Sequence, residues 1–163
     1  MKIAVTGTPG TGKTTISKLY EDEGLKVIHL TEYVKEKGLG EEGEKEFEVD
    51  VDEMREALKD ENFDVIEGHL AHHVPVDVCV VLRTRPDILR ERLEERDYRD
   101  EKVEENVQSE ILDVVLSEAV ENQETVVEVD TTEKDADEVF EEIKRKVEKE
   151  ENDYGNFDWT QFL

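Results

Sequence analysis

Residues 3–20 read IAVTGTPGTGKTTISKLY, and this stretch decides the fold. It opens with a short apolar run, residues 3–6, which is typical of a strand buried in a parallel sheet. Residues 7–14 follow and match the pattern G-x-x-x-x-G-K-[ST] at every fixed position. The spacing of apolar side chains then predicts a helix from about residue 12 to residue 23. A glycine-rich turn between a strand and a helix is the setting in which this pattern predicts a phosphate-binding loop.

The residue types in this loop explain why it would hold a chain of phosphates. Gly10 and Gly12 let the backbone turn so that successive N–H groups face one cavity. The N-terminus of the following helix adds roughly half a positive charge. Lys13 is predicted to bridge the β- and γ-phosphates of a nucleotide. The Thr14 hydroxyl is predicted to ligate Mg²⁺, and Thr15 to hydrogen-bond a further phosphate.

Strands and helices are predicted to alternate along the rest of the chain. Further strands are expected at residues 26–30, 63–67, 76–82 and 125–129, and further helices after residue 84, over residues 100–120 and after residue 132. Thr84 and Thr132 are the expected N-caps of two of these helices. Residues 31–62 are expected to be helical and loop-like. This order predicts an α/β fold, a three-layer sandwich with a five-stranded parallel sheet.

The composition narrows the classes of function. The chain has 163 residues with 21 basic and 46 acidic side chains, which gives a formal net charge of −25. Direct binding to nucleic acid or to an anionic membrane is disfavoured, because both need a basic surface. So large a charge also repels itself, and we hypothesise a halophilic source whose salt screens that repulsion. The alternative is an ordinary acidic cytosolic protein.

The location is predicted from what the sequence lacks. No apolar stretch approaches the ~18 residues of a membrane-spanning helix. The first residues do not have the anatomy of a signal peptide, so a cytoplasmic location is expected. Cys79 is the single cysteine, which excludes an internal disulfide and a multi-cysteine zinc site.

Acidic and histidine side chains follow the strand predicted at residues 63–67. Glu67 falls at its carboxyl end, where open α/β sheets bind ligands, so it is predicted to hold magnesium directly or through water. His69 is predicted to reach the γ-phosphate or its attacking water. His72 and His73 are weaker candidates and are expected to be solvated, as most histidine pairs on such a loop are. A histidine-rich metal site is the alternative, although no acid or cysteine completes it at zinc spacing. A salt bridge at the sheet edge for Glu67 and a plain loop position for His69 are the alternatives.

Arginines gather in one short segment. Six of the eight lie within seventeen residues: Arg83, Arg85, Arg90, Arg92, Arg96 and Arg99. Guanidinium groups suit the charge that phosphoryl transfer spreads over three oxygens. Arg96 stands at a predicted helix end, from which a closing loop would bring it onto the phosphates. Arg90 and Arg92 alternate with glutamates and are predicted to form ion pairs on the helix surface. Arg83 and Arg99 are weaker candidates for phosphate contacts.

Together these motifs resemble those of a known family. From residue 1 to about residue 147 the sequence is similar to the archaeal and eukaryotic branch of nucleoside monophosphate kinases called the sixth adenylate kinase isoenzyme family. The resemblance is carried by residues 6–15 (TGTPGTGKTT), 65–69 (VIEGH), 81–84 (VLRT), 93–96 (LEER) and 105–110 (ENVQSE). Members of that family are described as nuclear adenylate kinases and ATPases with a role in small ribosomal subunit maturation.

The resemblance implies a division of the chain into segments. Residues 1–150 would form one P-loop kinase-like domain. Within it, residues 29–53 would hold the nucleoside monophosphate and residues 95–105 would form a short lid. Residues 151–163 would form an acidic and aromatic tail. We expect this tail to dock onto the core.

The resemblance also implies roles for single residues. ATP would be bound by Gly10, Gly12, Lys13, Thr14 and Thr15, with Arg96 as the ATP-contacting arginine of the lid. Glu67 stands where relatives often carry an aspartate. His69 matches the family's histidine linked to ATP hydrolysis. Lys35 stands where some relatives have an arginine that contacts the monophosphate.

These expectations lead to two functions. The first is a phosphotransferase that converts ATP and AMP into two ADP with the help of Mg²⁺. The second is an ATPase that acts in assembly, binding a basic small-subunit ribosomal protein and the pre-small-subunit particle, which a strongly negative surface would attract. A P-loop kinase of another small acceptor, such as shikimate or a dephosphorylated coenzyme, is a further alternative. A GTPase is disfavoured, since the chain has no N-K-x-D motif.

Overall fold

The computed structural model describes residues 1–44 and 46–163. In chain order its strands and helices are β1 (Ile3–Gly7), α1 (Lys13–Asp22), β2 (Val27–His29), α2 (Leu30–Glu36), β3 (Gly40–Glu42), β4 (Phe47–Val49), α3 (Val51–Leu58), β5 (Val65–Glu67), the 3-10 helix η1 (Ala71–His73), β6 (Val78–Arg83), α4 (Pro86–Glu95), α5 (Asp100–Ile111), α6 (Val114–Asn122), β7 (Val126–Asp130), α7 (Ala136–Lys149) and the 3-10 helix η2 (Thr160–Phe162).

Five strands form one parallel sheet in the order β2-β5-β1-β6-β7. The first strand lies in the middle, between β5 and β6. Its register pairs Val5 with Glu67 and Gly7 with Leu82. The loop that follows β1 and the acid that ends β5 therefore emerge at the same edge of the sheet. The predicted α/β class and the five-stranded parallel sheet are confirmed.

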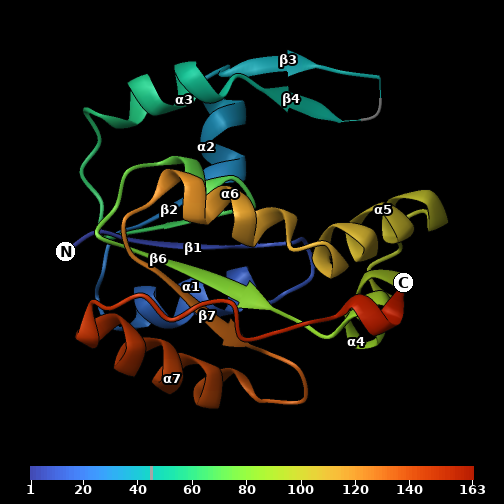
Figure 1. Ribbon diagram of the computed structural model, residues 1–163. Coiled ribbons are helices and arrows are strands. Elements are labelled where there is room, and N and C mark those ends of the chain that lie inside the picture. The colour runs from blue at the N-terminus through green and yellow to red at the C-terminus, as the bar shows by residue number, and fades with distance from the viewer. Residues whose placement is uncertain (45) are drawn as a thin grey trace.

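Helices cover both faces of this sheet, because side chains alternate along each strand. On β1, Ile3 and Val5 pack into a core with α1 and α7. Ala4 faces the opposite core, which contains residues of α2, α3 and α6. Figure 1 shows α1 and α7 on one side of the strands and α2, α3 and α6 on the other. This is the three-layer arrangement that buried parallel strands require.

A third, smaller core joins the pair α4 and α5 to the C-terminal tail. Leu89 and Leu93 of α4 pack with Val103, Val107 and Ile111 of α5, and Trp159 and Phe162 pack against this cluster. The tail also runs along the edge strand β7: the N–H of Glu128 donates to Asp153 O, and the N–H of Asp153 donates to Val126 O. The expectation that the tail docks onto the core is confirmed. It covers a sheet edge that would otherwise be unpaired.

The acidic segment expected to be helical and loop-like contains a β-hairpin instead. Strands β3 and β4 pair antiparallel, with Glu41 opposite Glu48. Phe47 and Val49 pack against the core beneath α2 and α3, while Glu48 is exposed. The sequence analysis missed the hairpin because only these two apolar residues alternate, among many glutamates. In Figure 1 the hairpin stands above the sheet, beside α2 and α3.

The helix predicted over residues 100–120 is broken. It ends as α5 at Ile111, and α6 begins at Val114 after Asp113, whose φ is +55°. The break brings the Asp113 carboxylate to Nη2 of buried Arg83 at 2.6 Å. Val114, the first residue of α6, is exposed. A long-range ion pair therefore interrupts a pattern that is continuous in the sequence.

The predicted threonine caps are also wrong. The Thr84 hydroxyl bonds that of Thr131 at 2.6 Å, and the Thr132 hydroxyl accepts from the N–H of Arg85 at 2.8 Å. Both threonines thus join the ends of β6 and β7. The last helix is capped by Asp135 instead, whose side chain accepts from the N–H of Glu138. Strand β5 begins at Val65, two residues later than predicted.

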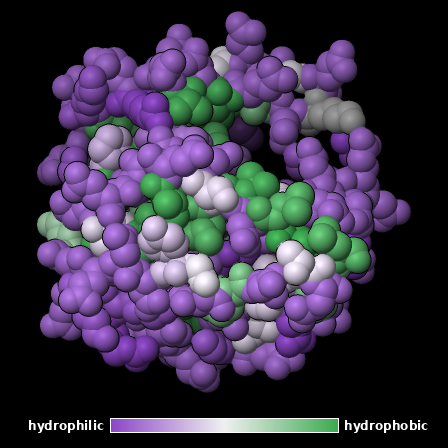
Figure 2. Space-filling model, in the orientation of Figure 1, coloured by the Kyte–Doolittle hydropathy of each residue, from purple (hydrophilic) through white to green (hydrophobic). Residues whose placement is uncertain are grey.

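Charged side chains dominate the surface. Figure 2 shows a largely hydrophilic face crossed by hydrophobic patches, which lie over the position of α6 and α5 in Figure 1. Leu112 and Val114, both exposed, lie at the junction of these two helices. Within the described residues, no helix combines the length and the apolar character needed to cross a membrane.

Candidate active site

The loop after β1 adopts a conformation that its glycines make possible. Gly10 has φ +94° and Gly12 has φ +100°, values that side chains with a Cβ rarely adopt. A Cβ on Gly10 would also lie 2.9 Å from Leu89 and 3.0 Å from Leu93. The glycine therefore lets α4 pack directly against the loop. Helix α1 then begins at Lys13, so its N-terminal N–H groups face the space above the loop.

Lys13 lies in the middle of this loop. Its Nζ donates to Gly7 O at 3.0 Å and to Thr8 O at 3.1 Å. The side chain is buried, and this desolvation lowers the pKa of Lys13 to about 8. Glu67 opposes this effect, while the nearby Arg96 adds to it. A phosphate placed here would restore the positive charge of the amine, because an anion favours the protonated form. Thr14 and Thr15, the next two residues, are exposed beside it.

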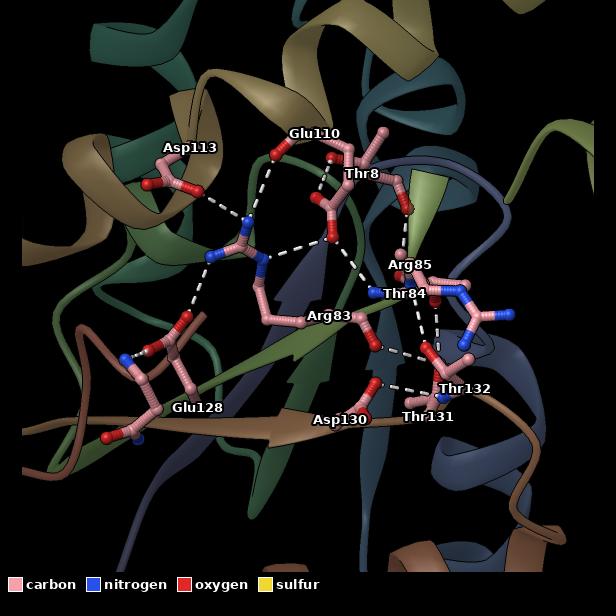
Figure 3. Close-up of polar contacts among 12 residues, drawn as sticks. Thr8, Arg83, Thr84, Arg85, Glu110, Asp113, Glu128, Asp130, Thr131 and Thr132 are labelled. Carbon is pink, nitrogen blue, oxygen red and sulfur yellow. Dashed lines mark hydrogen bonds and ion pairs between the residues drawn. The ribbon is translucent and has the colours of Figure 1, made fainter. Parts of the chain in front are cut away.

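A buried ionic network holds the loop from behind (Figure 3). Arg83 is buried, with Nε 3.0 Å from Glu110 Oε2 and Nη1 2.7 Å from Glu128 Oε2. Its desolvation is outweighed by Glu110 and Asp113, which raise the pKa of the guanidinium. Glu110 Oε1 in turn accepts from the Thr8 hydroxyl at 2.9 Å. Arg83 therefore positions the loop and cannot reach a phosphate itself.

The acid predicted to hold magnesium lies across the cavity from the loop. Glu67 is buried, and its Oε2 is 3.1 Å from His29 Nδ1. Burial disfavours the charged form of His29, but its contacts with Glu67 and Glu21 outweigh this and raise its pKa. The Glu67 carboxylate and the Thr14 hydroxyl line the same cavity. Both are oxygen donors of the kind that Mg²⁺ takes in proteins, so the residues present fit this ion.

His69 lies in the cavity as well, next to Gly68 at the end of β5. Desolvation, followed by the positive charge of Lys13, lowers the pKa of His69 to about 4. The residue as a whole is exposed on the cavity side, so its ring is only partly withdrawn from water. At neutral pH the imidazole is uncharged, and one ring nitrogen can accept a proton.

Two arginines line the mouth of the loop. Arg96 ends α4, is exposed, and faces both the main cavity and a smaller one behind the loop. Arg92 is half-buried and does not form the predicted surface ion pair. Its Nη2 donates to Thr131 O at 2.9 Å, and its Nη1 to the Thr84 and Thr131 hydroxyls. Burial lowers the pKa of Arg92, and the charge of Arg96 adds to this. Arg90 pairs with Glu104 of α5 at 2.8 Å.

Three cavities lie in a row on this side of the molecule, and two of them are lined by the loop. The central one, of about 500 Å³, is lined by Lys13, Glu67, His69 and Arg96. One of about 340 Å³ opens from it and is lined mainly by apolar residues: Leu30, Val34, Phe47, Val49, Val51 and Leu70. One of about 230 Å³ lies behind Gly10 and Gly12, against Arg92 and Lys134. The central cavity shares lining residues with both others, so the three lie next to one another.

Most of the sequence-predicted site residues are brought together in the central cavity. Lys13, Thr14, Thr15, Glu67, His69 and Arg96 all line the central cavity. Lys35 lines the apolar cavity, and Arg99 lines an outer hollow beside α5. Arg92, Asn106 and Glu118 were missed as cavity residues. Asn106 and Glu118 face the cavity from α5 and α6. Asn106 lies within the motif at residues 105–110, which gave it no role of its own, and no motif marks Glu118.

His72 and His73 do not lie in solvent, and this prediction is wrong. The His72 ring is fully buried, and His73 is half-buried. Nδ1 of His72 is 2.8 Å from the Thr6 hydroxyl. An acid does stand beside the pair: Glu118, which α6 supplies from 46 residues further along the chain. Spacing in the sequence could not reveal it.

Comparison with known proteins agrees with this geometry. A family profile described as "AAA domain" matches residues 3–113. A protein of Thermococcus kodakarensis named "Putative adenylate kinase" is 48% identical, over 99% of this chain and 94% of its own length. A protein of the same name from Natronomonas pharaonis is also 48% identical and covers 100% of both chains.

The fold is shared with more distant solved structures. Shikimate kinase from Bacteroides thetaiotaomicron superimposes with a TM-score of 0.61 at 20% identity, covering 91% of this chain and 98% of its own. At that identity the likeness concerns the fold alone. The P-loop, the parallel sheet and the close relatives agree: the chain belongs to the AAA-domain family that this profile describes, together with these putative adenylate kinases, and is a phosphotransferase.

Proposed function

We propose that this protein is a nucleoside monophosphate kinase that transfers the γ-phosphoryl group of ATP to AMP, with Mg²⁺ as cofactor. The observation that carries the proposal is the row of three neighbouring cavities, the central one of which is lined by the P-loop. A plain ATPase needs one nucleotide pocket and room for a water molecule. A pocket for a second organic ring, on the far side of the phosphate cavity, is what a kinase of small acceptors requires.

In this proposal the base of the donor nucleotide, ATP, would bind behind the P-loop. The cavity there lies between Gly10, Gly12, Arg92 and Thr131. Arg96 lines both this cavity and the central one, so its guanidinium can contact the phosphates where they pass from one cavity to the other. The N–H groups at the start of α1, together with Lys13, would hold the β- and γ-phosphates.

The acceptor, AMP, would bind against the hairpin of β3 and β4. Phe47 and Val49 of β4 and Leu30 and Val34 of α2 give this cavity an apolar wall suited to a planar base. Lys35 is the cation on this wall that would meet the acceptor's phosphate. The hairpin also carries many glutamates, and salt would weaken their repulsion of the phosphate. Residues 29–53 would thus hold the monophosphate.

Catalysis in this arrangement rests on position and charge. The two nucleotides would approach each other in the central cavity, where Lys13 and Arg96 neutralise the charge that develops on the transferred group. Magnesium, held by Thr14 and Glu67, would supply further charge neutralisation on the phosphate oxygens. His29 orients the Glu67 carboxylate through its 3.1 Å contact. None of these residues needs to form a covalent bond.

Water must be kept from the γ-phosphate during transfer. Residues 95–105, which span the connection between α4 and α5 and the first part of α5, would form the short lid over the cavity. Glu46 beside the hairpin and Lys102 of α5 form an ion pair at 3.0 Å across the mouth, and both line the cavity. Closure of the lid would exclude bulk solvent, because water otherwise competes with the acceptor.

ATP hydrolysis in the service of ribosomal small-subunit maturation is the second function that we propose. His69 supports it, since a neutral imidazole in the phosphate cavity can accept a proton from water. The net charge of −25 would attract a basic ribosomal protein on the pre-small-subunit particle. The cytoplasm is the compartment that would hold these partners.

A panel of acceptors tests the proposal. Purified protein is incubated with Mg·ATP and, in turn, AMP, other nucleoside monophosphates, shikimate or no acceptor, at several KCl concentrations. We expect ADP to form fastest with AMP. Equal ADP formation with and without every acceptor would leave hydrolysis as the activity, and a preference for a non-nucleotide acceptor would refute the assignment of AMP.

A further inference from the structure

Three metal-ligating side chains converge beside the central cavity and take no part in the chemistry proposed above. His72 and His73 come from η1, and Glu118 comes from α6. One ligand atom of each lies within 4.8 Å of those of the other two. Glu118 Oε2 is 2.7 Å from Nε2 of His72 and 3.4 Å from Nε2 of His73. Two imidazole nitrogens and a carboxylate oxygen are a ligand set that binds zinc and similar ions.

The backbone that carries both histidines is held rigidly. Nε of Arg55, from α3, donates to His73 O at 2.7 Å. Nε2 of Gln123, at the end of α6, donates to His72 O at 2.8 Å and to Val74 O at 2.7 Å. Side chains from two different helices therefore fix the turn. A ligand set held in place in this way loses little conformational entropy when an ion binds.

The chemical state of the two rings also suits an ion. Burial lowers the pKa of both His72 and His73, although their contacts with Glu118 oppose this. A neutral ring offers a lone pair to a metal without first losing a proton. The Thr6 hydroxyl stands 2.8 Å from Nδ1 of His72 and can either donate or accept a proton there. It can therefore hold the tautomer that leaves Nε2 of His72 free to bind.

An ion could enter from the central cavity. The Glu118 side chain is 41% exposed, and its residue lines that cavity together with Lys13 and Ser109. The buried side of the cluster is closed by the His72 ring, whose side chain is 0% exposed. Three protein ligands on one side and a solvent-filled cavity on the other leave room for water as a fourth ligand.

We propose that His72, His73 and Glu118 form a binding site for a divalent transition-metal ion of the zinc type, separate from the magnesium site at Thr14 and Glu67. The ion would join η1 to α6. Through the contact between His72 and Thr6 it would also be linked to β1, one residue before Gly7. Hard ions such as Mg²⁺ would not compete, since imidazole nitrogen is a poor ligand for them. The competing explanation is a hydrogen-bonded cluster that binds no ion.

Cobalt provides the test, because Co²⁺ bound by nitrogen and oxygen in a four- or five-coordinate site has visible absorption bands that octahedral Co²⁺ shows only weakly. The nucleotide-free protein is stripped with a chelator and titrated with Co²⁺ in excess Mg²⁺, which occupies the surface carboxylates. We expect one equivalent to give these bands and Zn²⁺ to abolish them, since zinc binds such sites more tightly than cobalt. The titration is repeated with His73→Gln, Glu118→Gln and, as a control in the same cavity, His69→Gln.

The outcomes separate the two explanations. The proposal predicts that Co²⁺ affinity falls at least about tenfold in His73→Gln and in Glu118→Gln and is unchanged in His69→Gln. It also predicts that Zn²⁺ raises the melting temperature of the unmodified protein and of His69→Gln, but not of the other two. The absence of visible bands, or bands that survive in both cluster variants, would overturn it. The experiment uses no nucleotide, so its failure would leave the proposed kinase activity untouched.

Discussion

The hydroxyl of Thr8, within the P-loop, donates a 2.9 Å hydrogen bond to Oε1 of Glu110, a residue that lies 102 positions further along the chain. Oε2 of the same carboxylate accepts from Nε of Arg83 and from the N–H of Thr84. One buried carboxylate thus holds the loop, the end of β6 and α5 together. Arg83 carries this link on to Glu128, whose other oxygen accepts from the tail at Gly155 and Asn156.

Replacing Glu110 with glutamine should destabilise the protein strongly. An amide has one oxygen acceptor in place of two and lacks the charge, so it leaves buried Arg83 short of a partner. We expect a loss on the order of 3 kcal/mol in the free energy of unfolding, as for other broken buried ion pairs. Urea denaturation measures it. Glu105→Gln, exposed on the same helix, is the matched control and should change stability by less than about 0.5 kcal/mol. Equal effects of the two variants would contradict the assigned role of the network.

ATP binding should be linked to proton uptake by Lys13. The pKa of this amine is about 8 in the free protein, and phosphate oxygens would raise it. Above pH 8 much of the amine is neutral and must take up a proton when ATP binds. Affinity for Mg·ATP should therefore fall as the pH rises through 8.

Calorimetry in buffers of different ionisation enthalpy measures that uptake. It should be largest about one pH unit above the pKa and vanish about two units below it. Lys13→Met should show no uptake and greatly weakened binding. Lys18→Met, exposed on the same helix, is the control and should behave like the unmodified protein. A uniform affinity across this pH range would show that Lys13 does not meet the phosphates.

Replacing His69 with asparagine should separate the two proposed activities. The neutral ring would assist the attack of water on the γ-phosphate, and such general-base assistance contributes about 10²- to 10⁴-fold in rate. We expect phosphate release without AMP to fall by at least about tenfold. Transfer to AMP, which depends on Lys13 and Arg96, should change far less. Equal losses in both reactions would show that His69 serves binding in general.

The hydrolysis catalysed by the unmodified protein carries a matching pH dependence. The pKa of His69 is about 4, so the ring is neutral and able to accept a proton throughout the neutral range. Hydrolysis should not decline between pH 7 and pH 6, whereas a histidine with the ordinary value near 6.5 would lose activity there. A rate that drops steeply over this interval would contradict the proposed state of the ring.

Salt should stabilise the protein. A net charge of −25 repels itself in dilute buffer, and the Debye length falls to about 3 Å near 1 M salt. The melting temperature should therefore rise from low to high KCl. Sucrose at matched osmolality is the control, because it stabilises without screening charge. No rise with KCl, or the same rise with sucrose, would remove the argument for salt adaptation.

The loop and the sheet could be predicted from sequence because their signals are local. Residues 7–14 carry a complete motif, and apolar runs mark the strands. Lys13, Glu67, His69 and Arg96 were found because each lies at the end of a strand or helix that the pattern already predicted. Parallel topology brings those ends to one edge of the sheet.

The features that were missed depend on contacts between distant parts of the chain. The break at Asp113 exists because Arg83 binds its carboxylate. Arg92 alternates with glutamates like a surface residue, yet it turns inward to Thr131 O. His72 is buried by Thr6 and Glu118, neither of which is near it in sequence. Periodicity cannot reveal such pairs, because their two partners are far apart in the sequence and meet only in the folded protein.

The central claim is that the P-loop cavity passes a phosphoryl group from ATP to a second nucleotide, and ³¹P NMR of Mg·ATP mixed with AMP tests it most directly. The account predicts that ATP and AMP disappear in equal amounts while two ADP form for each pair, and that Lys13→Met abolishes this exchange while Lys18→Met retains it. Accumulation of ADP and inorganic phosphate with the AMP signal unchanged would contradict it.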